Sequence, residues 1–245
     1  MTTFNIYPAI DLMEGNVVRL KKGDPNQKTI FSNNPLSIAN KWLSFGAKWL
    51  HIVNLDAAFG YDDDNNMQAI TMIQNEFQNK SIAIQIGGGI RSFEQIDNYL
   101  NRGITRIILG TKAIEDQNFV ADAIRKFGPS RIVIGIDARN EFVSTHGWKK
   151  DSSIIALSLT QELKTIGVKT IIYTDINRDG IGSGINLSAT QELAQQSGME
   201  VIASGGVNSI SDIVSVREAG LSGVIVGRAL YDGTIDPKKL FEIQE

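Results

Sequence analysis

Short apolar runs rich in Ile or Val alternate with amphipathic segments along the whole chain. The eight runs lie at residues 4–10, 49–54, 82–86, 105–110, 131–136, 170–174, 200–204 and 223–227. Such near-continuous apolar runs are typical of parallel strands that are covered on both faces. Eight strand–helix units in 245 residues favour a closed barrel, because barrels of this kind need about 250 residues. We therefore predict an α/β fold, a (βα)8 TIM barrel, with residues 1–245 as a single domain.

Two stretches of the chain repeat each other at half its length. Residues 86–114 align without a gap on residues 203–231, and the repeat pairs Gly88 with Gly205, Gly89 with Gly206, Ser92 with Ser209, and Gly110 with Gly227. A repeat at half length predicts two half-barrels, roughly residues 1–127 and 128–245, and two matching ligand subsites.

Composition excludes several classes of function. The net charge is -3 and no block of Lys or Arg is present, so we expect no nucleic-acid partner. Without cysteine there is no disulfide, thiolate metal site or cysteine nucleophile. The two histidines have no partners at a metal-binding spacing, which predicts no metal; His51 lies in a strand run and is expected in or near the core, whereas His146 lies in a loop. No apolar run approaches a membrane span and the N-terminus has no basic leader, so we expect a cytoplasmic protein without a membrane partner.

Two aspartates follow equivalent strands of the predicted barrel. Asp11 directly follows the first run and Asp137 directly follows the fifth, and the active site of a parallel barrel lies at the C-terminal ends of its strands. Either residue alone is as well explained as a loop cap. Their matched placement favours catalysis, because two carboxyl groups across one mouth can accept and donate a proton. Thr174 ends the sixth run and is expected to add a supporting hydrogen bond.

Four glycine turns follow the third, fourth, seventh and eighth strands. They contain Gly88 and Gly89, Gly110, Gly205 and Gly206, and Gly227. A glycine turn that enters a helix presents free N–H groups to a phosphate, and the last two turns lie where barrels often hold one. The repeat then predicts a second phosphate across the mouth, with Thr111 and Arg228 as candidates for side-chain contacts. The alternative is that these glycines only relieve crowding at tight turns.

Two segments, residues 12–31 and 138–150, are longer than the usual two to six residues of a strand-to-helix loop. Long loops at this face commonly act as lids or binding loops, although each segment also contains one arm of a short β-ribbon. Trp148 is suited to stack on a flat heterocycle, and Arg19 to pair with a carboxylate or phosphate.

Several long motifs, in register, resemble the isomerase family of histidine biosynthesis: PAIDLMEGNVVRLKKGD, IGGGIRS, GIDARN followed by THGW, TDINRDG, and ASGGVNS followed by GVIVGRAL. The resemblance extends over nearly the whole chain. It implies an aldose–ketose isomerase that performs an Amadori rearrangement on phosphoribosylformimino-aminoimidazole carboxamide ribotide, a small molecule with a phosphate at each end. It further implies that no cofactor or metal is used, that Asp11 is the general base and that Asp137 is the general acid. We expect a monomer.

Three alternatives stay open beside this interpretation: an isomerase that also acts on phosphoribosyl anthranilate, the cyclase subunit of imidazole glycerol phosphate synthase, and a non-catalytic phosphosugar-binding protein. The stretch VVRLKKGD differs from the VVKG pattern of the cyclase, and the two aspartates argue against a silent binder. The sequence departs from the family pattern at Asn54, where an acid is common, at Phe31, where an aromatic hydroxyl is common, and at Ile185, where proline is common. These departures leave loop contacts open.

Overall fold

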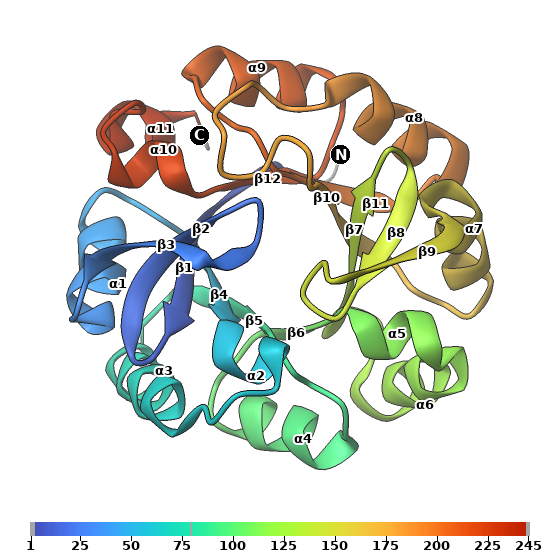
Figure 1. The fold of residues 1–245 in the computed structure, drawn as a ribbon, viewed down its shortest axis with the longest axis horizontal. Coiled ribbons are helices and arrows are strands. Elements are labelled where there is room, and N and C mark those ends of the chain that lie inside the picture. The colour runs from blue at the N-terminus through green and yellow to red at the C-terminus, as the bar shows by residue number, and fades with distance from the viewer. Residues whose placement is uncertain (1–2, 79, 244–245) are drawn as a thin grey trace.

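The computed structural model describes residues 3–78 and 80–243, which form a closed ring of eight parallel strands surrounded by helices (Figure 1). The ring contains, in order, β1 (Asn5–Met13), β4 (Trp49–Asn54), β5 (Ala83–Gly87), β6 (Arg106–Leu109), β7 (Ile132–Arg139), β10 (Thr170–Asp175), β11 (Glu200–Ser204) and β12 (Gly223–Val226). β12 pairs with β1, and β7 pairs with β10. The predicted (βα)8 barrel is confirmed, and each predicted apolar run coincides with one barrel strand.

Helices connect the strands and begin at the residues that their sequences favour. They are α1 (Pro35–Ser44), α2 (Leu55–Phe59), α3 (Asp64–Phe77), α4 (Phe93–Asn101), α5 (Thr111–Glu115), α6 (Gln117–Phe127), α7 (Ala156–Thr165), α8 (Leu187–Ser197), α9 (Ile210–Glu218), α10 (Arg228–Tyr231) and α11 (Pro237–Glu242). Ser92 and Ser209 each close a capping box at the start of α4 and α9. Each box satisfies backbone N–H groups that a helix start leaves free. The two copies of the repeat therefore begin their helices in the same way.

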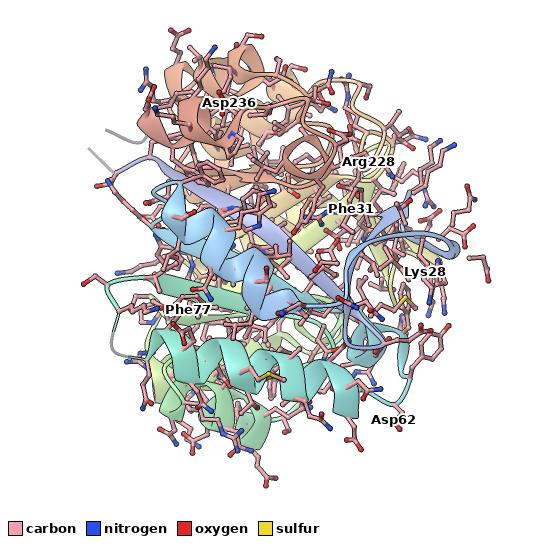
Figure 2. All side chains as sticks on the ribbon, turned by 90° about the vertical axis from the view of Figure 1, so that its left-hand side faces the viewer. Lys28, Phe31, Asp62, Phe77, Arg228 and Asp236 are labelled. Atoms are coloured by element: carbon pink, nitrogen blue, oxygen red, sulfur yellow. The ribbon has the colours of Figure 1, made fainter. Side chains whose placement is uncertain are left out.

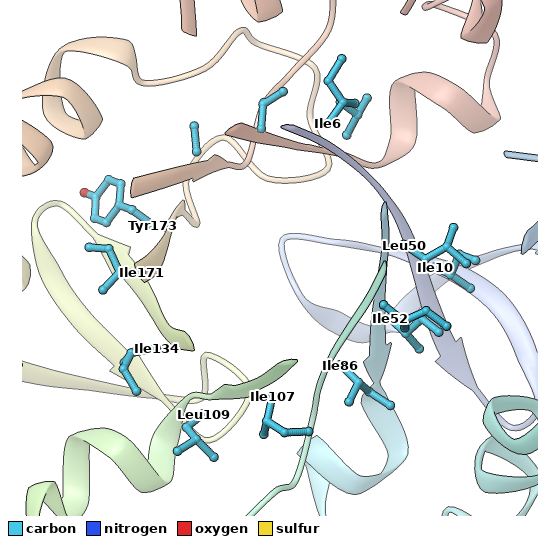
Figure 3. Close-up of a cluster of buried hydrophobic side chains, with 14 of the residues drawn as sticks. Ile6, Ile10, Leu50, Ile52, Ile86, Ile107, Leu109, Ile134, Ile171 and Tyr173 are labelled. Carbon is cyan, nitrogen blue, oxygen red and sulfur yellow. The ribbon is translucent and has the colours of Figure 1, made fainter. Parts of the chain in front are cut away.

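Apolar side chains alternate between the two faces of the barrel wall. Ile10, Ile52, Ile86 and Ile107 belong to the outer layer between strands and helices (Figure 3). A second layer fills the interior of the ring and contains Tyr7, Ala9, Ile108, Val133, Ile172, Ile202 and Ile225. Because both faces are buried, the strands read as continuous apolar runs. Each fully buried Ile or Leu contributes about 1.5–3 kcal/mol.

Two antiparallel hairpins interrupt the strand–helix alternation. β2 (Asn16–Lys21) and β3 (Asp24–Ser32) follow β1, and β8 (Phe142–Thr145) and β9 (Lys150–Ile155) follow β7. Figure 1 shows the hairpins reaching over the barrel from opposite sides. In the view of Figure 2, Lys28, Asp62 and Arg228 lie toward one end of the barrel and Phe77 lies toward the other. The two long loops of the sequence are therefore β-ribbons at the C-terminal end of the strands.

Among the described residues, no helix combines the length and the hydropathy needed to cross a bilayer.

Gln74 on α3 is a point of weakness in this packing. It is buried, and neither polar atom of its side chain has a hydrogen-bond partner within residues 3–78 and 80–243. An unsatisfied buried amide costs about 1–3 kcal/mol. Gln74→Met keeps the length of the side chain and removes both polar atoms, so we expect the free energy of unfolding to rise by about 1–2 kcal/mol. Urea denaturation measures this change.

Gln68 provides the matched control, because it lies on the same helix and is exposed. Gln68→Met is expected to change the urea midpoint little. A lower midpoint for Gln74→Met than for the unchanged protein would contradict the prediction.

Candidate active site

A cavity opens at the C-terminal ends of the barrel strands, and every site residue that the sequence predicted lines it. These residues are Asp11, Arg19, Gly88, Gly89, Gly110, Thr111, Asp137, Trp148, Thr174, Gly205, Gly206, Gly227 and Arg228. They come from the C-terminal ends of seven barrel strands and from both hairpins. The fold thus assembles residues that are more than 200 positions apart in the chain into one candidate site.

Asp11 lies at the end of β1 and is held by the adjacent hairpin. Arg19 on β2 forms an ion pair with Oδ2 of Asp11 and donates a second hydrogen bond to the carbonyl oxygen of Ala9 at 2.6 Å. The guanidinium also lies 5.1 Å from the centre of the Tyr231 ring. Arg19 was expected to pair with a carboxylate or a phosphate, and the structure places it on Asp11. It therefore fixes the orientation of this carboxylate.

Asp137 lies at the end of β7 in a different environment. The indole Nε1 of Trp148 donates to its Oδ2 at 2.8 Å, and the hydroxyl of Thr174 on the neighbouring strand donates a further hydrogen bond. Desolvation by burial raises the pKa of Asp137, and these two hydrogen bonds oppose the rise without cancelling it. Asp137 thus holds its proton to a higher pH than an ordinary aspartate does.

The tip of the β8–β9 hairpin packs against neighbouring loops at the mouth of the cavity. The ring of Trp148 covers Gly23 so closely that a Cβ at Gly23 would overlap it. A Cβ at Gly147 would lie 2.5 Å from the Phe59 ring, and the ammonium of Lys149 lies 4.9 Å from the centre of the same ring. Trp148 was expected to stack on a heterocycle. In this structure it connects the two hairpins and hydrogen-bonds Asp137, and its stacking on a heterocycle stays a prediction.

Asp179 is a cavity residue that the predicted site did not include. It follows β10 in the motif TDINRDG and lines the cavity with Asp11 and Asp137. Burial raises the pKa of Asp179 to about 7, and the negative charges of the other two aspartates act in the same direction. The positive charges of Arg19 and Arg228 oppose them. The only sequence signal was a second acid in that motif, and sequence does not show that the loop folds back into the cavity.

Crowding by protein atoms accounts for two of the glycine turns. Gly88 and Gly205 have φ angles of +105° and +89°, which favour glycine. A Cβ at Gly88 would overlap the carbonyl oxygen of Asn54, and one at Gly205 would lie 2.7 Å from that of Asp175. A Cβ at Gly110, in contrast, would meet nothing within 4 Å among the described residues. Tight packing thus explains the glycine pairs after β5 and β11, while the turn after β6 faces open space.

The three departures from the family pattern lie outside the cavity wall. Asn54 is fully buried, donates to Asp63 at 2.7 Å and accepts from Asn66 at 2.9 Å. An ionised aspartate could not make the first of these bonds. Phe31 packs 5.0 Å from the Tyr231 ring centre, and Ile185 packs against the outer core. The side-chain contacts described for these three residues therefore involve no residue of the cavity wall.

The two histidines have different places. His51 is buried in the barrel interior, as expected, and also reaches the cavity. His146 lies beside the cavity wall, where its backbone N–H donates to the hydroxyl of Thr111 at 2.9 Å. Across the described part of the chain, no group of three or more His, Asp or Glu side chains is arranged to hold a metal ion.

Comparison with known proteins identifies the family. The sequence pattern of the family described as "Histidine biosynthesis protein" matches residues 5–236. This chain belongs to that family.

Relatives match this chain over almost their full length. One from Oceanobacillus iheyensis is 46% identical and covers 97% of each chain. One from Ruminiclostridium cellulolyticum is 43% identical over 96% of this chain and 97% of its own, and one from Rhodospirillum centenum is 47% identical over 96% and 94%. All three are named 1-(5-phosphoribosyl)-5-((5-phosphoribosylamino)methylideneamino) imidazole-4-carboxamide isomerase.

Two glycines with positive φ allow a matched stability test. Gly88→Ala and Gly103→Ala both place a side chain at a positive φ, but only Gly88 has a backbone oxygen in the way. Gly103→Ala is expected to cost about 1–2 kcal/mol. Gly88→Ala is expected to cost at least about 2 kcal/mol more, because the neighbouring strand must shift. Urea denaturation compares the two, and equal midpoints would contradict this account of Gly88.

Asp179 gives a prediction for the pH dependence of stability. Because its pKa is raised in the folded state to about 7, the folded chain binds a proton that the unfolded chain has released above about pH 4. The stability from this proton is complete below pH 4 and is lost as the pH rises through 7. Asp179→Asn removes this loss, so at pH 8 the variant should be the more stable protein. Urea denaturation at several pH values measures the free energy of unfolding of both proteins. A difference between the two proteins that stays constant from pH 4.5 to 8 would contradict the raised pKa of Asp179.

Proposed function

We propose that this chain catalyses an aldose–ketose isomerisation in L-histidine biosynthesis. The substrate would be phosphoribosylformimino-aminoimidazole carboxamide ribotide, and the Amadori rearrangement would convert its phosphoribosyl group into a phosphoribulosyl group. The observation that carries the proposal is the pair Asp11 and Asp137, which line one cavity at the ends of β1 and β7 in contrasting environments. Aspartates in contrasting environments are suited to opposite roles in proton transfer. The names of the relatives support the same reaction.

In the first step Asp137 acts as the general acid. Its raised pKa keeps a proton available closer to neutral pH, and Trp148 and Thr174 hold the carboxyl group in place. The proton passes to the ring oxygen of the ribose, the bond between that oxygen and C1 breaks, and the sugar opens to a protonated Schiff base. Asp137 is left as a carboxylate.

In the second step Asp11 acts as the general base. Among the described residues, only Arg19 donates a hydrogen bond to its carboxylate, and it uses Oδ2. Oδ1 is therefore the oxygen that can accept the proton from C2. Loss of that proton neutralises the Schiff base to an enolamine, which tautomerises to the aminoketose. The reaction moves protons and shifts a double bond, and it needs no electron acceptor.

We assign the two ends of the substrate to the repeated turns at Gly110 and Gly227. These glycines share one backbone conformation, with φ and ψ of −102° and −108° at Gly110 and of −107° and −107° at Gly227. Thr111 and Arg228 follow them. The Nε atom of Arg228 is buried and finds no acceptor in the part of the chain that the structure describes, so a phosphate oxygen would satisfy it.

Since one chain supplies the whole cavity wall, we further propose that the enzyme is active as a monomer.

The proposed roles predict that either aspartate is essential. Asp11→Asn and Asp137→Asn should each lower kcat by at least about 100-fold, because each loses proton transfer. Turnover is followed by ultraviolet absorbance with the purified protein, the ribotide and a coupling cyclase. Asp62→Asn is the control, because Asp62 is exposed and does not line the cavity.

Two results would overturn the proposal. Absence of turnover by the unchanged protein would remove the isomerase function, and a near-normal kcat for either variant would remove the role of that residue. Phosphoribosyl anthranilate, offered as a second substrate, distinguishes an isomerase with one substrate from one with two.

A further inference from the structure

Polar side chains run through the barrel interior below the candidate active site. His51 on β4, Gln85 on β5 and Arg106 on β6 occupy paired positions of neighbouring strands. All three are buried. Gln85 Nε2 lies 2.8 Å from His51 Nδ1, and Arg106 Nε lies 2.9 Å from Gln85 Oε1. The three side chains therefore form one continuous hydrogen-bonded chain in an otherwise apolar layer.

Arg106 sets the direction of this chain. A guanidinium can only donate, so the side-chain oxygen of Gln85 must face Arg106 and its NH2 group must face His51. Nδ1 of His51 is then the acceptor, and the proton of the neutral ring lies on Nε2. Burial, together with the positive charges of Arg19 and Arg106, lowers the pKa of His51 to about 3. The ring is therefore neutral at the pH of the cell, with a defined tautomer.

Neutral partners anchor Arg106 at the lower end of the chain. Its Nη2 donates to the hydroxyl of Tyr7 at 2.7 Å, and its guanidinium lies 4.3 Å from the centre of the Trp49 ring. No carboxylate forms an ion pair with Arg106 within residues 3–78 and 80–243. The orientation of Gln85 thus rests on groups that do not titrate near neutral pH.

The upper end of the chain reaches the reaction chamber. His51 on β4 pairs with Ala9 on β1, which lies two residues before Asp11. Residues two apart on a strand point to the same face, so the side chains of His51 and Asp11 both face the barrel interior, with His51 one layer below Asp11. It contributes to the wall of the same cavity as Asp11 and Asp137. Its Nδ1 is used by Gln85, and no described residue accepts a hydrogen bond from its Nε2. The chain therefore ends in a donor with no protein partner, below Asp11.

We propose that His51 donates a hydrogen bond from Nε2 to an oxygen atom of the reacting sugar, and that Gln85 and Arg106 are positioning residues that fix its tautomer. The inference rests on the proposed isomerase function. During the rearrangement the C2 hydroxyl becomes a ketone, and a preorganised donor stabilises charge that develops on such an oxygen. A neutral imidazole suits this task, because it polarises the oxygen without acting as a second acid beside Asp137.

Nitrogen NMR of the free enzyme tests the tautomer without any substrate. The chain contains only two histidines, and a spectrum of His146→Gln assigns the signals of each. In protein labelled with 15N-histidine, His51 should show an unprotonated Nδ1 and a protonated Nε2 at pH 7. Gln85→Glu places a carboxylate against the ring, and this acceptor should move a proton onto Nδ1. An Nδ1–H tautomer in the unchanged protein would overturn the proposal.

Kinetics of matched variants test the donor. In His51→Gln the amide nitrogen can take the place of Nε2, whereas in His51→Asn it can reach only the place of Nδ1. We expect His51→Gln to keep kcat within about 10-fold of the unchanged protein, and His51→Asn and Gln85→Glu to lose about 100-fold or more, as oxyanion donors do. KM should change much less than kcat. Thermal denaturation confirms that the variants fold equally well.

The results separate the two proposals. Absence of turnover by the unchanged protein would reject the isomerase function itself. Turnover by the unchanged protein with equal kcat for the equally stable His51→Gln and His51→Asn variants would reject the role of His51 alone. A kcat for Gln85→Glu equal to that of the unchanged protein, with its tautomer reversed, would reject the positioning role.

Discussion

Closure of the sheet by the parallel pairing of β12 with β1 is the constraint on which the site depends. In a closed parallel barrel every strand must end at the same rim. Asp11, Asp137 and Arg228, far apart in sequence, consequently line one cavity. The same closure buries both faces of every strand, which explains why the wall requires two apolar layers and leaves little room for polar side chains inside the ring.

The closed barrel also brings charged side chains together at the rim. Asp11, Asp137 and Asp179 face the cavity together with the guanidinium groups of Arg19 and Arg228. Carboxyl groups held close together and removed from water resist joint ionisation, so a proton stays on Asp179 up to about pH 7. Arg19 fixes one aspartate by an ion pair, while Trp148 holds another by a neutral hydrogen bond. Two chemically identical side chains thus acquire different properties from their surroundings.

Local patterns predicted the parts of the structure that local chemistry determines. The barrel strands, the helix starts at Ser92 and Ser209, and the placement of Asp11 and Asp137 at strand ends followed from apolar runs and capping residues. The half-barrel boundary at residues 127 and 128 stays a prediction. So do the functional roles of the glycine turns, since packing against Asn54 and Asp175 already explains two of them.

Contacts between loops could not be read from the sequence in the same way. The ion pair of Arg19 with Asp11, the inward turn of Asp179 and the contact of Trp148 with Gly23 depend on how two long hairpins bend over the barrel. The hydrogen-bonded chain from Arg106 to His51 depends on strand register, which a single sequence does not specify. Each of these interactions joins residues that no short-range pattern relates.

The hydrogen bond from the Trp148 indole links the position of the β8–β9 hairpin to the pKa of Asp137. Its hydrogen bond to Asp137 is the first of the two that lower the pKa of that buried group. If the hairpin lifts, Asp137 loses the bond while the mouth opens to water. Burial, which has the larger effect, would be lost at the same time, so the pKa of Asp137 is highest and its proton is held most firmly while the hairpin covers the chamber.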